Sequence, residues 1–225
     1  MLDKCDPELG KRVHEHLLSV GLETPMVYDK VKAKQDKKIK TIAKHFTAIM
    51  EELGLDLTDD SLIDTPNRVA KMYTREIFFG LDYDNFPKCT RIENKMGESM
   101  SFVLERNVNV QSNCEHHFVV IDGKATVAYI PKKTILGLSK LNRIVQFFAK
   151  RPQVQERLTE QIAETISFIT GSPDVAVYIE GVHYCVKSRG IQDTTSTTMT
   201  LATRGAFAEV QSELRREFLN SARMK

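Results

Sequence analysis

The order of periodic segments after residue 100 limits the fold more than any other property of this chain. Six segments follow one another: 100–111 and 118–130 with strand-like alternation, 139–148 and 152–171 with helical spacing, and 175–186 and 194–207 with alternation again. Strands joined as hairpins pair antiparallel, and the two helices then cover one face of the sheet. We therefore expect an α+β fold built on a β-β-α-α-β-β unit, with Asp122-Gly123 interrupting the second strand.

The first 80 residues have a helical pattern instead. Apolar residues recur at helical spacing from Ile39 to Leu53, and Thr65 is expected to cap a second helix that Gly80 ends. Pro152 is expected to open the second helix of the later unit, and Ser212 a terminal helix. These patterns divide the chain into a helical region over 1–95 and a sheet-containing domain over 96–225. A four-stranded sheet has two free edges, which favours oligomerisation.

The composition fits a cytoplasmic globular protein. Hydrophobic residues make up 41% and charged residues 28%, and the net charge of +2 gives no field for nucleic acid or membranes. The N-terminus does not resemble a signal peptide, and no apolar run approaches the ~20 residues of a membrane span. In a reducing compartment the four cysteines are expected to be free thiols.

Two short segments carry residues that could bind a metal ion: Cys114-Glu-His-His117 and His183-Tyr-Cys185. A tight turn can direct both ends of the first segment at one ion, and the strand period of two places His183 and Cys185 on one face. Two thiolates and one imidazole suit zinc, and three ligands leave a position for water. Two alternatives stay open: buried residues without metal, or a four-ligand structural zinc that includes His116 or His183.

Four longer runs in the same order make a family recognisable: Cys-Glu-His-His-Phe (114–118), Gly-Leu-Ser-Lys-Leu-Asn-Arg-Ile-Val (137–145), Arg-Pro-Gln-Val-Gln-Glu-Arg-Leu (151–158) and Val-His-Tyr-Cys-Val-Lys-Ser-Arg-Gly (182–190). With them, the chain resembles the zinc-dependent form of GTP cyclohydrolase I from about Ile39 to Phe207. The resemblance implies the tunnelling fold, which uses the same β-β-α-α-β-β order. It also implies a toroidal homodecamer with active sites between subunits.

The reaction that the resemblance implies converts GTP and water to formate and 7,8-dihydroneopterin triphosphate, the first step of pterin and folate biosynthesis. One zinc ion per subunit would be bound by three residues: Cys114, His117 and Cys185. His183 would protonate the purine nitrogen remote from the ribose, and His116 would act on the ribose side, because imidazole exchanges protons near neutral pH. Ser139 matches a family position implicated in the later ribose steps, and as a residue type it also suits a helix N-cap.

The same resemblance implies substrate-binding residues. Glu156, with its neighbour Gln155, would face the ring N–H and the exocyclic amino group of guanine. The triphosphate would be bound by cations: Lys140, Arg143, Arg189 and, from a neighbouring subunit, Arg68. Lys140 and Arg143 lie three residues apart on one helical face, which fits a joint anion site. The sequence has no Walker or dinucleotide-binding glycine motif, which disfavours a GTPase switch.

Two other classes of protein remain as alternatives. One is a GTP-binding or structural zinc oligomer without turnover, which the complete set of expected catalytic residues does not support. The other is a different enzyme on the same fold, such as a pterin synthase or a nitrile reductase of queuosine synthesis. Those enzymes use other metal patterns or a cysteine nucleophile, unlike the paired Cys114 and Cys185 here. Residues 1–35 and 211–225 carry no motif of the family, and no segment identifies a regulatory protein partner.

Overall fold

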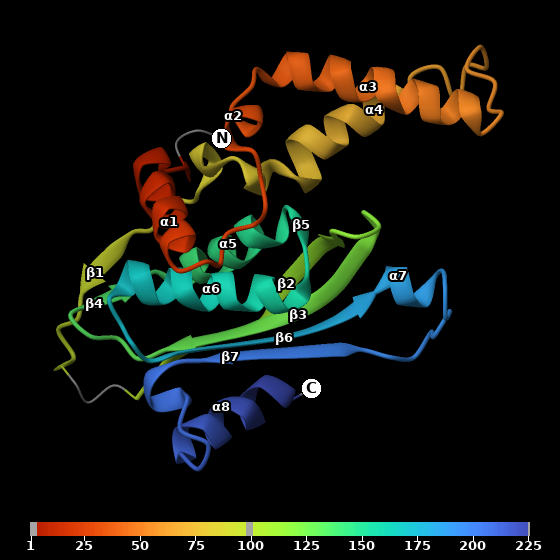
Figure 1. The fold of residues 1–225 in the computed structure, drawn as a ribbon. Helices are drawn as coiled ribbons and strands as arrows, with labels where there is room; N and C mark the ends of the chain where they lie inside the picture. The colour runs from red at the N-terminus through yellow and green to blue at the C-terminus, as the bar shows by residue number, and fades with distance from the viewer. Residues whose placement is uncertain (1–3, 98–100, 225) are drawn as a thin grey trace.

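The computed structural model describes residues 4–97 and 101–224, so Met100, where the first strand was expected to begin, lies outside the described residues. The helices are α1 (Pro7–Ser19), α2 (Tyr28–Val31), α3 (Gln35–Glu52), α4 (Thr65–Met72), α5 (Leu138–Ala149), α6 (Gln155–Thr170), α7 (Tyr184–Lys187) and α8 (Glu213–Arg223). The strands are β1 (Arg91–Glu93), β2 (Val103–Cys114), β3 (Val120–Tyr129), β4 (Thr134–Leu136), β5 (Pro152–Gln153), β6 (Val175–His183) and β7 (Thr198–Thr203). The α+β class and the order of the six main elements are confirmed (Figure 1).

A five-stranded sheet in the order β5-β2-β3-β6-β7 forms the centre of the fold (Figure 1). The four long strands pair antiparallel, and β5 runs parallel to the end of β2. The prediction of a helix opening at Pro152 was wrong, because Pro152 and Gln153 form β5 and α6 begins at Gln155. Proline suits the first turn of a helix, but it also suits the edge of a sheet, where no donor is needed.

The predicted interruption of the second strand at Asp122-Gly123 was also wrong, since β3 continues through both residues. Gly123 lies opposite Gly181 in β6, and a Cβ at position 123 would overlap the carbonyl oxygen of Glu180. The glycine therefore permits a close approach of two strands rather than a turn.

Helices α5 and α6 lie together on one face of the sheet, and the main core fills the space between them and the strands (Figure 1). The helical spacing predicted the buried face of α5 correctly, because four of its side chains are fully buried: Leu141, Ile144, Val145 and Phe148. Helix α8 covers part of the opposite face, where Phe218 packs with Phe207 and Tyr178. The predicted terminal helix is confirmed, and Ser212 is its N-cap residue, which accepts a hydrogen bond of 3.1 Å from the amide of Arg215.

Two N-terminal caps differ from the predictions. Gly137 is the N-cap residue of α5, and Ser139 lies inside the first turn without a capping hydrogen bond. Asp64, rather than Thr65, occupies the N-cap position of α4. Shifts of two residues and one residue, respectively, are within the usual uncertainty of helix boundaries read from sequence. The first shift removes the capping explanation for Ser139, whose side chain is exposed.

Both predicted N-terminal helices form, but α4 ends at Met72 and a π-helical segment follows over Tyr73–Ile77, so the prediction that Gly80 ends this helix was wrong. Helices α3 and α4 pack together as an arm that extends away from the sheet (Figure 1). A small cluster of Ile39, Ala43 and Ala70 joins the two helices. Other apolar side chains of the arm and its connecting loop are exposed: Ile49, Leu53, Leu55 and Ile63. None of the helices in the described part of the chain is long and apolar enough to cross a membrane.

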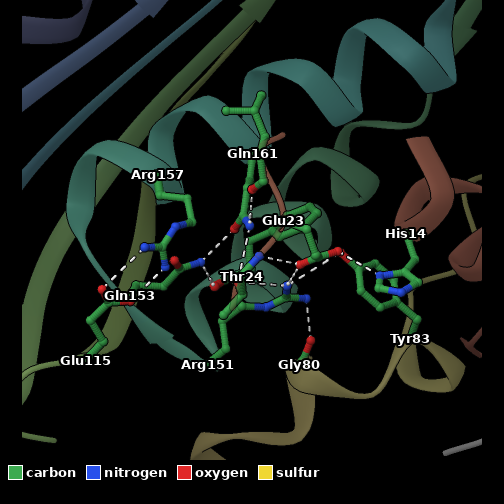
Figure 2. A network of polar contacts seen from close by, with 12 residues as sticks. His14, Glu23, Thr24, Gly80, Tyr83, Glu115, Arg151, Gln153, Arg157 and Gln161 are labelled. Carbon is green, nitrogen blue, oxygen red and sulfur yellow. Dashed lines mark hydrogen bonds and ion pairs between the residues drawn. The ribbon is translucent and has the colours of Figure 1, made fainter. Parts of the chain in front are cut away.

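The first helix is joined to the core through a buried charge, Arg151, whose side chain is 0% exposed (Figure 2). Nη1 of Arg151 lies 3.1 Å from Oε1 of Glu23, and Nη2 donates to the carbonyl of Gly80. Glu23 also accepts a hydrogen bond of 2.5 Å from the hydroxyl of Tyr83 and lies 2.8 Å from Nδ1 of His14. The guanidinium group of Arg151 lies over three aromatic rings: Tyr83, Phe147 and Phe148.

Replacement of this arginine is expected to destabilise the chain strongly. Arg151→Met should lower the free energy of unfolding by about 3–5 kcal/mol, because it leaves the buried Glu23 carboxylate without its charge partner. Urea denaturation at one fixed protein concentration measures the change. Arg204→Met is the matched control, since Arg204 binds the partly exposed carboxylates of Glu160 and Glu164 and should contribute about 1 kcal/mol. Equal losses in the two variants would contradict the role given to burial.

Candidate metal centre

Three predicted ligands come together at one end of the sheet. Cys114 ends β2, His117 lies in the turn that follows, and Cys185 lies in α7. Their ligand atoms all lie within 4.8 Å of one another, and Sγ of Cys114 is 4.0 Å from Nδ1 of His117. The group can therefore hold a metal ion.

Cys185 reaches this group by a route that the sequence did not predict. Strand β6 ends at His183, which pairs with Ile121 near the start of β3, and the chain then enters α7. His183 and Cys185 are therefore not two residues on one face of a strand, and that prediction was wrong. The alternation ends there because β3 begins at Val120 and offers no further partner along β6.

The turn that carries the first ligands is held by main-chain hydrogen bonds. The amide of Cys114 donates to Val119 at 2.8 Å, and the amide of Phe118 donates back to Cys114 at 2.8 Å. The amide of Glu115 donates to the carbonyl of Gln153 at 3.0 Å, which joins the turn to β5. Strand β5 therefore supports the metal ligands directly from the neighbouring edge of the sheet.

The chemistry of the donors fits a soft divalent cation. Burial raises the pKa of Cys185, and the adjoining Cys114 thiol raises it further. Two neighbouring thiols resist losing both protons unless a cation compensates their charge, and a bound metal ion does this. Two sulfurs and one imidazole nitrogen are donors that zinc accepts, with a fourth position left over. Arg189 lies against the same group, with Nη1 2.8 Å from Nε2 of His117.

His183 lies beside the metal group and is oriented by Gln155. Its Nε2 is 2.8 Å from Oε1 of Gln155, whose side chain is 1% exposed. The Gln155 amide nitrogen donates to three further acceptors: Ile179 O, Thr198 O and Thr200 Oγ1. Gln155 was expected to contact a substrate, but in this conformation its side chain is committed to the protein and to His183.

The environment of His183 favours the neutral imidazole. Burial lowers its pKa, and the Glu156 carboxylate offsets only part of that effect. Glu156 itself is exposed in the first turn of α6, on the same side of the molecule. His116 has a side chain that is 64% exposed, with its Nδ1 3.7 Å from Sγ of Cys114. The imidazole of His116 is thus largely exposed, whereas that of His183 is partly buried and held by Gln155.

The remaining predicted residues lie elsewhere in the chain. Ser139, Lys140 and Arg143 belong to the start of α5, which follows β4. Leu136 of β4 donates its amide to the hydroxyl of Tyr129, at the far end of β3 from Ile121. At about 3.3 Å per residue, Ile121 and Tyr129 are roughly 25 Å apart along the strand. Figure 1 shows the same separation, with β4 at one end of the sheet and α7 at the other.

Arg68 belongs to neither group. It lies on α4 in the arm, exposed to solvent, with its Nε 3.4 Å from Asp64. The structure therefore separates the predicted site residues into a metal-end group, a cation-end group and one arginine on the arm. The metal-end group comprises Cys114, His116, His117, Gln155, Glu156, His183, Cys185 and Arg189; the cation-end group comprises Ser139, Lys140 and Arg143.

Sequence reasoning missed an ion pair within the metal turn. Glu115 lies between two candidate ligands and binds Arg157 of α6 through both carboxylate oxygens, at 2.7 and 3.3 Å. The Arg157 hydrogen bonds hold the pKa of Glu115 below its usual range. The available signal was that both residues belong to the recognisable runs 114–118 and 151–158, yet neither had been given a role.

Phe118 is a second residue whose role was missed. Its φ of 54° lies in the left-handed region, which is uncommon for a bulky side chain. The ring packs against Phe78 and Tyr73, with centroids 5.3 and 6.2 Å away. These contacts hold the chain reversal that returns the metal turn into β3. A positive φ cannot be read from residue type alone, so the run 114–118, which contains Phe118, did not indicate this role.

Comparisons with known proteins agree over nearly the whole chain. The model of the family described as GTP cyclohydrolase I matches residues 42–223. GTP cyclohydrolase 1 of Enterobacter sp. (strain 638) is 55% identical over 220 residues, which cover 96% of this chain and 98% of that protein. GTP cyclohydrolase 1 of Yersinia enterocolitica is 57% identical over 211 residues, with 94% of each chain covered. A solved structure of the archaeosine synthase QueF-Like matches at 20% identity and a TM-score of 0.40, over 48% of this chain and 96% of that chain.

The hydrogen bond between Gln155 and His183 requires a residue without a side chain at position 181. We expect a side chain at this position to break the hydrogen bond. A Cβ at position 181 would lie 2.8 Å from Oε1 of Gln155, so Gly181→Ala should displace that amide and lower stability by about 1–3 kcal/mol, as overpacking does. A crystal structure of the variant is expected to show Gln155 beyond hydrogen-bond distance of His183. Gly137→Ala is the control, because its nearest neighbour would be 3.6 Å away. An unchanged contact in Gly181→Ala would refute this reading.

Proposed function

The chain belongs to the GTP cyclohydrolase I family, and from this premise we propose that it converts GTP and water to formate and 7,8-dihydroneopterin triphosphate. It is a hydrolase of pterin and folate biosynthesis. One structural observation supports the proposal most directly: Cys114, His117 and Cys185 lie together, with His183 beside them. Cysteines that must remain thiols to bind a metal belong in a reducing compartment, and we place the enzyme in the cytoplasm.

We propose that the metal is zinc, with one ion per chain. Cys114, His117 and Cys185 would hold it, because two thiols and an imidazole match the preference of zinc and three ligands are typical of its catalytic sites. The chemistry supplied by bound zinc is the activation of water as a nucleophile at neutral pH. The rest of the reaction requires groups that move protons and hold the substrate.

His183 is proposed to carry the first proton transfer. As a neutral imidazole it can accept a proton from the attacking water and pass it to the purine nitrogen remote from the ribose. Gln155 fixes the ring during this exchange through the 2.8 Å contact to Nε2. His116, which is more exposed, would serve the ribose side, where the ring opens and the sugar later rearranges. Ser139 would assist those ribose steps.

The substrate is proposed to span the two groups of residues. Glu156 would accept hydrogen bonds from the ring N–H and the amino group of guanine, with Gln155 beside it. The triphosphate would be bound by four cations: Lys140, Arg143, Arg189 and Arg68. Negative charge on three phosphates explains why so many cations are required, since none of them belongs to a glycine-rich phosphate loop.

No single chain could offer both groups to one GTP molecule, because they lie at opposite ends of the sheet. We therefore propose that each active site lies between neighbouring copies, within a toroidal homodecamer of the tunnelling fold. In this arrangement, the domain over 96–225 supplies the joined sheets and the region over 1–95 supplies the arm with Arg68. The exposed apolar residues of the arm support a contact with another copy of the chain, because such patches on stable proteins are usually covered.

A direct assay tests the proposed reaction. Zinc-loaded protein incubated with GTP should release formate and yield a pterin that fluoresces after oxidation. Cys114→Ser should lose both the bound zinc and the turnover, because a hydroxyl is a poor substitute for a thiolate ligand. Wild-type protein that binds zinc but forms neither product would exclude the proposed activity.

A mixing experiment tests the sharing of the site. His183→Ala and Lys140→Ala should each be nearly inactive alone. Co-expressed with different tags and purified through both, they should recover about a quarter of the wild-type activity, because about one site in four would then combine an unaltered metal-end group with an unaltered cation-end group. His183→Ala mixed with Cys185→Ser is the control and should recover nothing, since both changes affect the metal-end group and every site would then contain one of them. Recovery in neither mixture would show that one chain supplies the whole site.

A further inference from the structure

Residues 22–24, which lie before the segment 42–223 matched by the family model, are connected to the metal turn by a short series of hydrogen bonds (Figure 2). The carbonyl of Leu22 accepts from Nε2 of Gln161 at 2.8 Å, and Oε1 of Gln161 accepts from Nε2 of Gln153 at 2.7 Å. The carbonyl of Gln153 accepts from the amide of Glu115 at 3.0 Å. Three hydrogen bonds therefore lead from Leu22 to the residue that follows Cys114.

A second connection reaches the same strand through its other end. Glu23 and Thr24 both contact Nη1 of Arg151, at 3.1 and 3.3 Å, and Arg151 directly precedes β5. The hydroxyl of Ser112 in β2 lies 3.4 Å from the carbonyl of Arg151. Both ends of the segment 151–153 are thus held by the segment 22–24, from inside the core.

The strand that these contacts hold is too short to keep its own position. Strand β5 has two residues, and a ladder of that length adds little stability by itself. The side chain of Gln153 is fully buried, and its Oε1 has no hydrogen-bond partner among the described residues. Displacement of β5 would therefore break two good hydrogen bonds of Gln153 without a replacement in the core.

We propose that Gln161 and Glu23 are positioning residues that fix the Cys114–His117 turn in the geometry that binds metal. Neither residue touches the metal ligands, and both act through the segment 151–153. The inference rests on the proposed zinc site and adds to it a role for the N-terminal segment. Residues behind the ligands of a metal commonly tune its affinity, because they orient the ligands before the metal arrives.

Gln161→Leu tests the first connection, because it removes the amide and keeps an apolar side chain in the core. The affinity for zinc, measured by competition with a chromogenic chelator, should fall about 10-fold, the lower end of the range for such residues. The visible absorption of the cobalt-substituted protein should change in position or intensity, since the geometry of the two thiolates changes. Both readouts are independent of turnover.

Thr165→Val is the matched control for this variant. Thr165 lies one helical turn after Gln161 on α6, is fully buried, and has a hydroxyl without a hydrogen-bond partner in the described part of the chain. The control should keep the zinc affinity and the cobalt spectrum of the wild-type protein, even if its melting temperature changes. A merely structural role for Gln161 would likewise change the melting temperature and leave both metal readouts unchanged, and that result would overturn the proposal.

Glu23→Gln tests the second connection, and it tests the proposal independently if Gln161→Leu does not fold. It keeps the shape of the side chain and removes the charge that binds Arg151, so zinc affinity should again fall about 10-fold. Glu164→Gln is its control, because Glu164 joins α1 to α6 through His16 without contacting the segment 151–153. Equal zinc affinities in these two variants would overturn the proposal. Wild-type protein that binds no zinc would instead reject the proposed metal site, so the two failures are distinguishable.

Discussion

The alignment of three strand ends is the constraint on which the metal centre depends. Strand β2 ends at Cys114, β3 begins at Val120, and His183 at the end of β6 lies opposite Ile121. Antiparallel pairing thus brings a turn and a strand end to the same end of the sheet, and α7 then turns Cys185 toward Cys114. A slip of one residue in either pairing would exchange the faces of the strand and separate the thiols. The register is in turn protected by the buried core beneath β3 and β6, where α6 packs.

Much of this arrangement could be predicted from the sequence. The order of the elements followed from periodicity, because strand and helix repeats differ clearly over ten or more residues. Cys114, His117 and Cys185 could be grouped because few other residue types bind zinc so well. The entry of Cys185 from a helix could not be predicted, since His183-Tyr-Cys185 fits both a strand and a helical turn, and only the length of β3 decides between them.

Other features depended on contacts between residues far apart in the chain. Pro152 and Gln153 read as a helix start until their pairing with β2 is known. The hydrogen bond from Gln155 to His183 could not be predicted, because it depends on the space that Gly181, 26 positions further along the chain, leaves for the Gln155 amide. The distance between the metal-end and cation-end groups could not be predicted either. The order of motifs along the chain indicates which residues are functional, but not at which end of the sheet each one lies.

The contact between Glu23 and Arg151 also limits the order in which parts of the chain can fold during synthesis. The two residues are 128 positions apart, and the ribosome makes the glutamate long before the arginine. Until then Glu23 must stay in water, because burying its charge alone would be costly. Helix α1 can form early, but it cannot dock in its final place before residue 151 has been synthesised. The first segment of the chain to be made is therefore among the last to be enclosed, and closure of so long a loop is a slow kind of folding step.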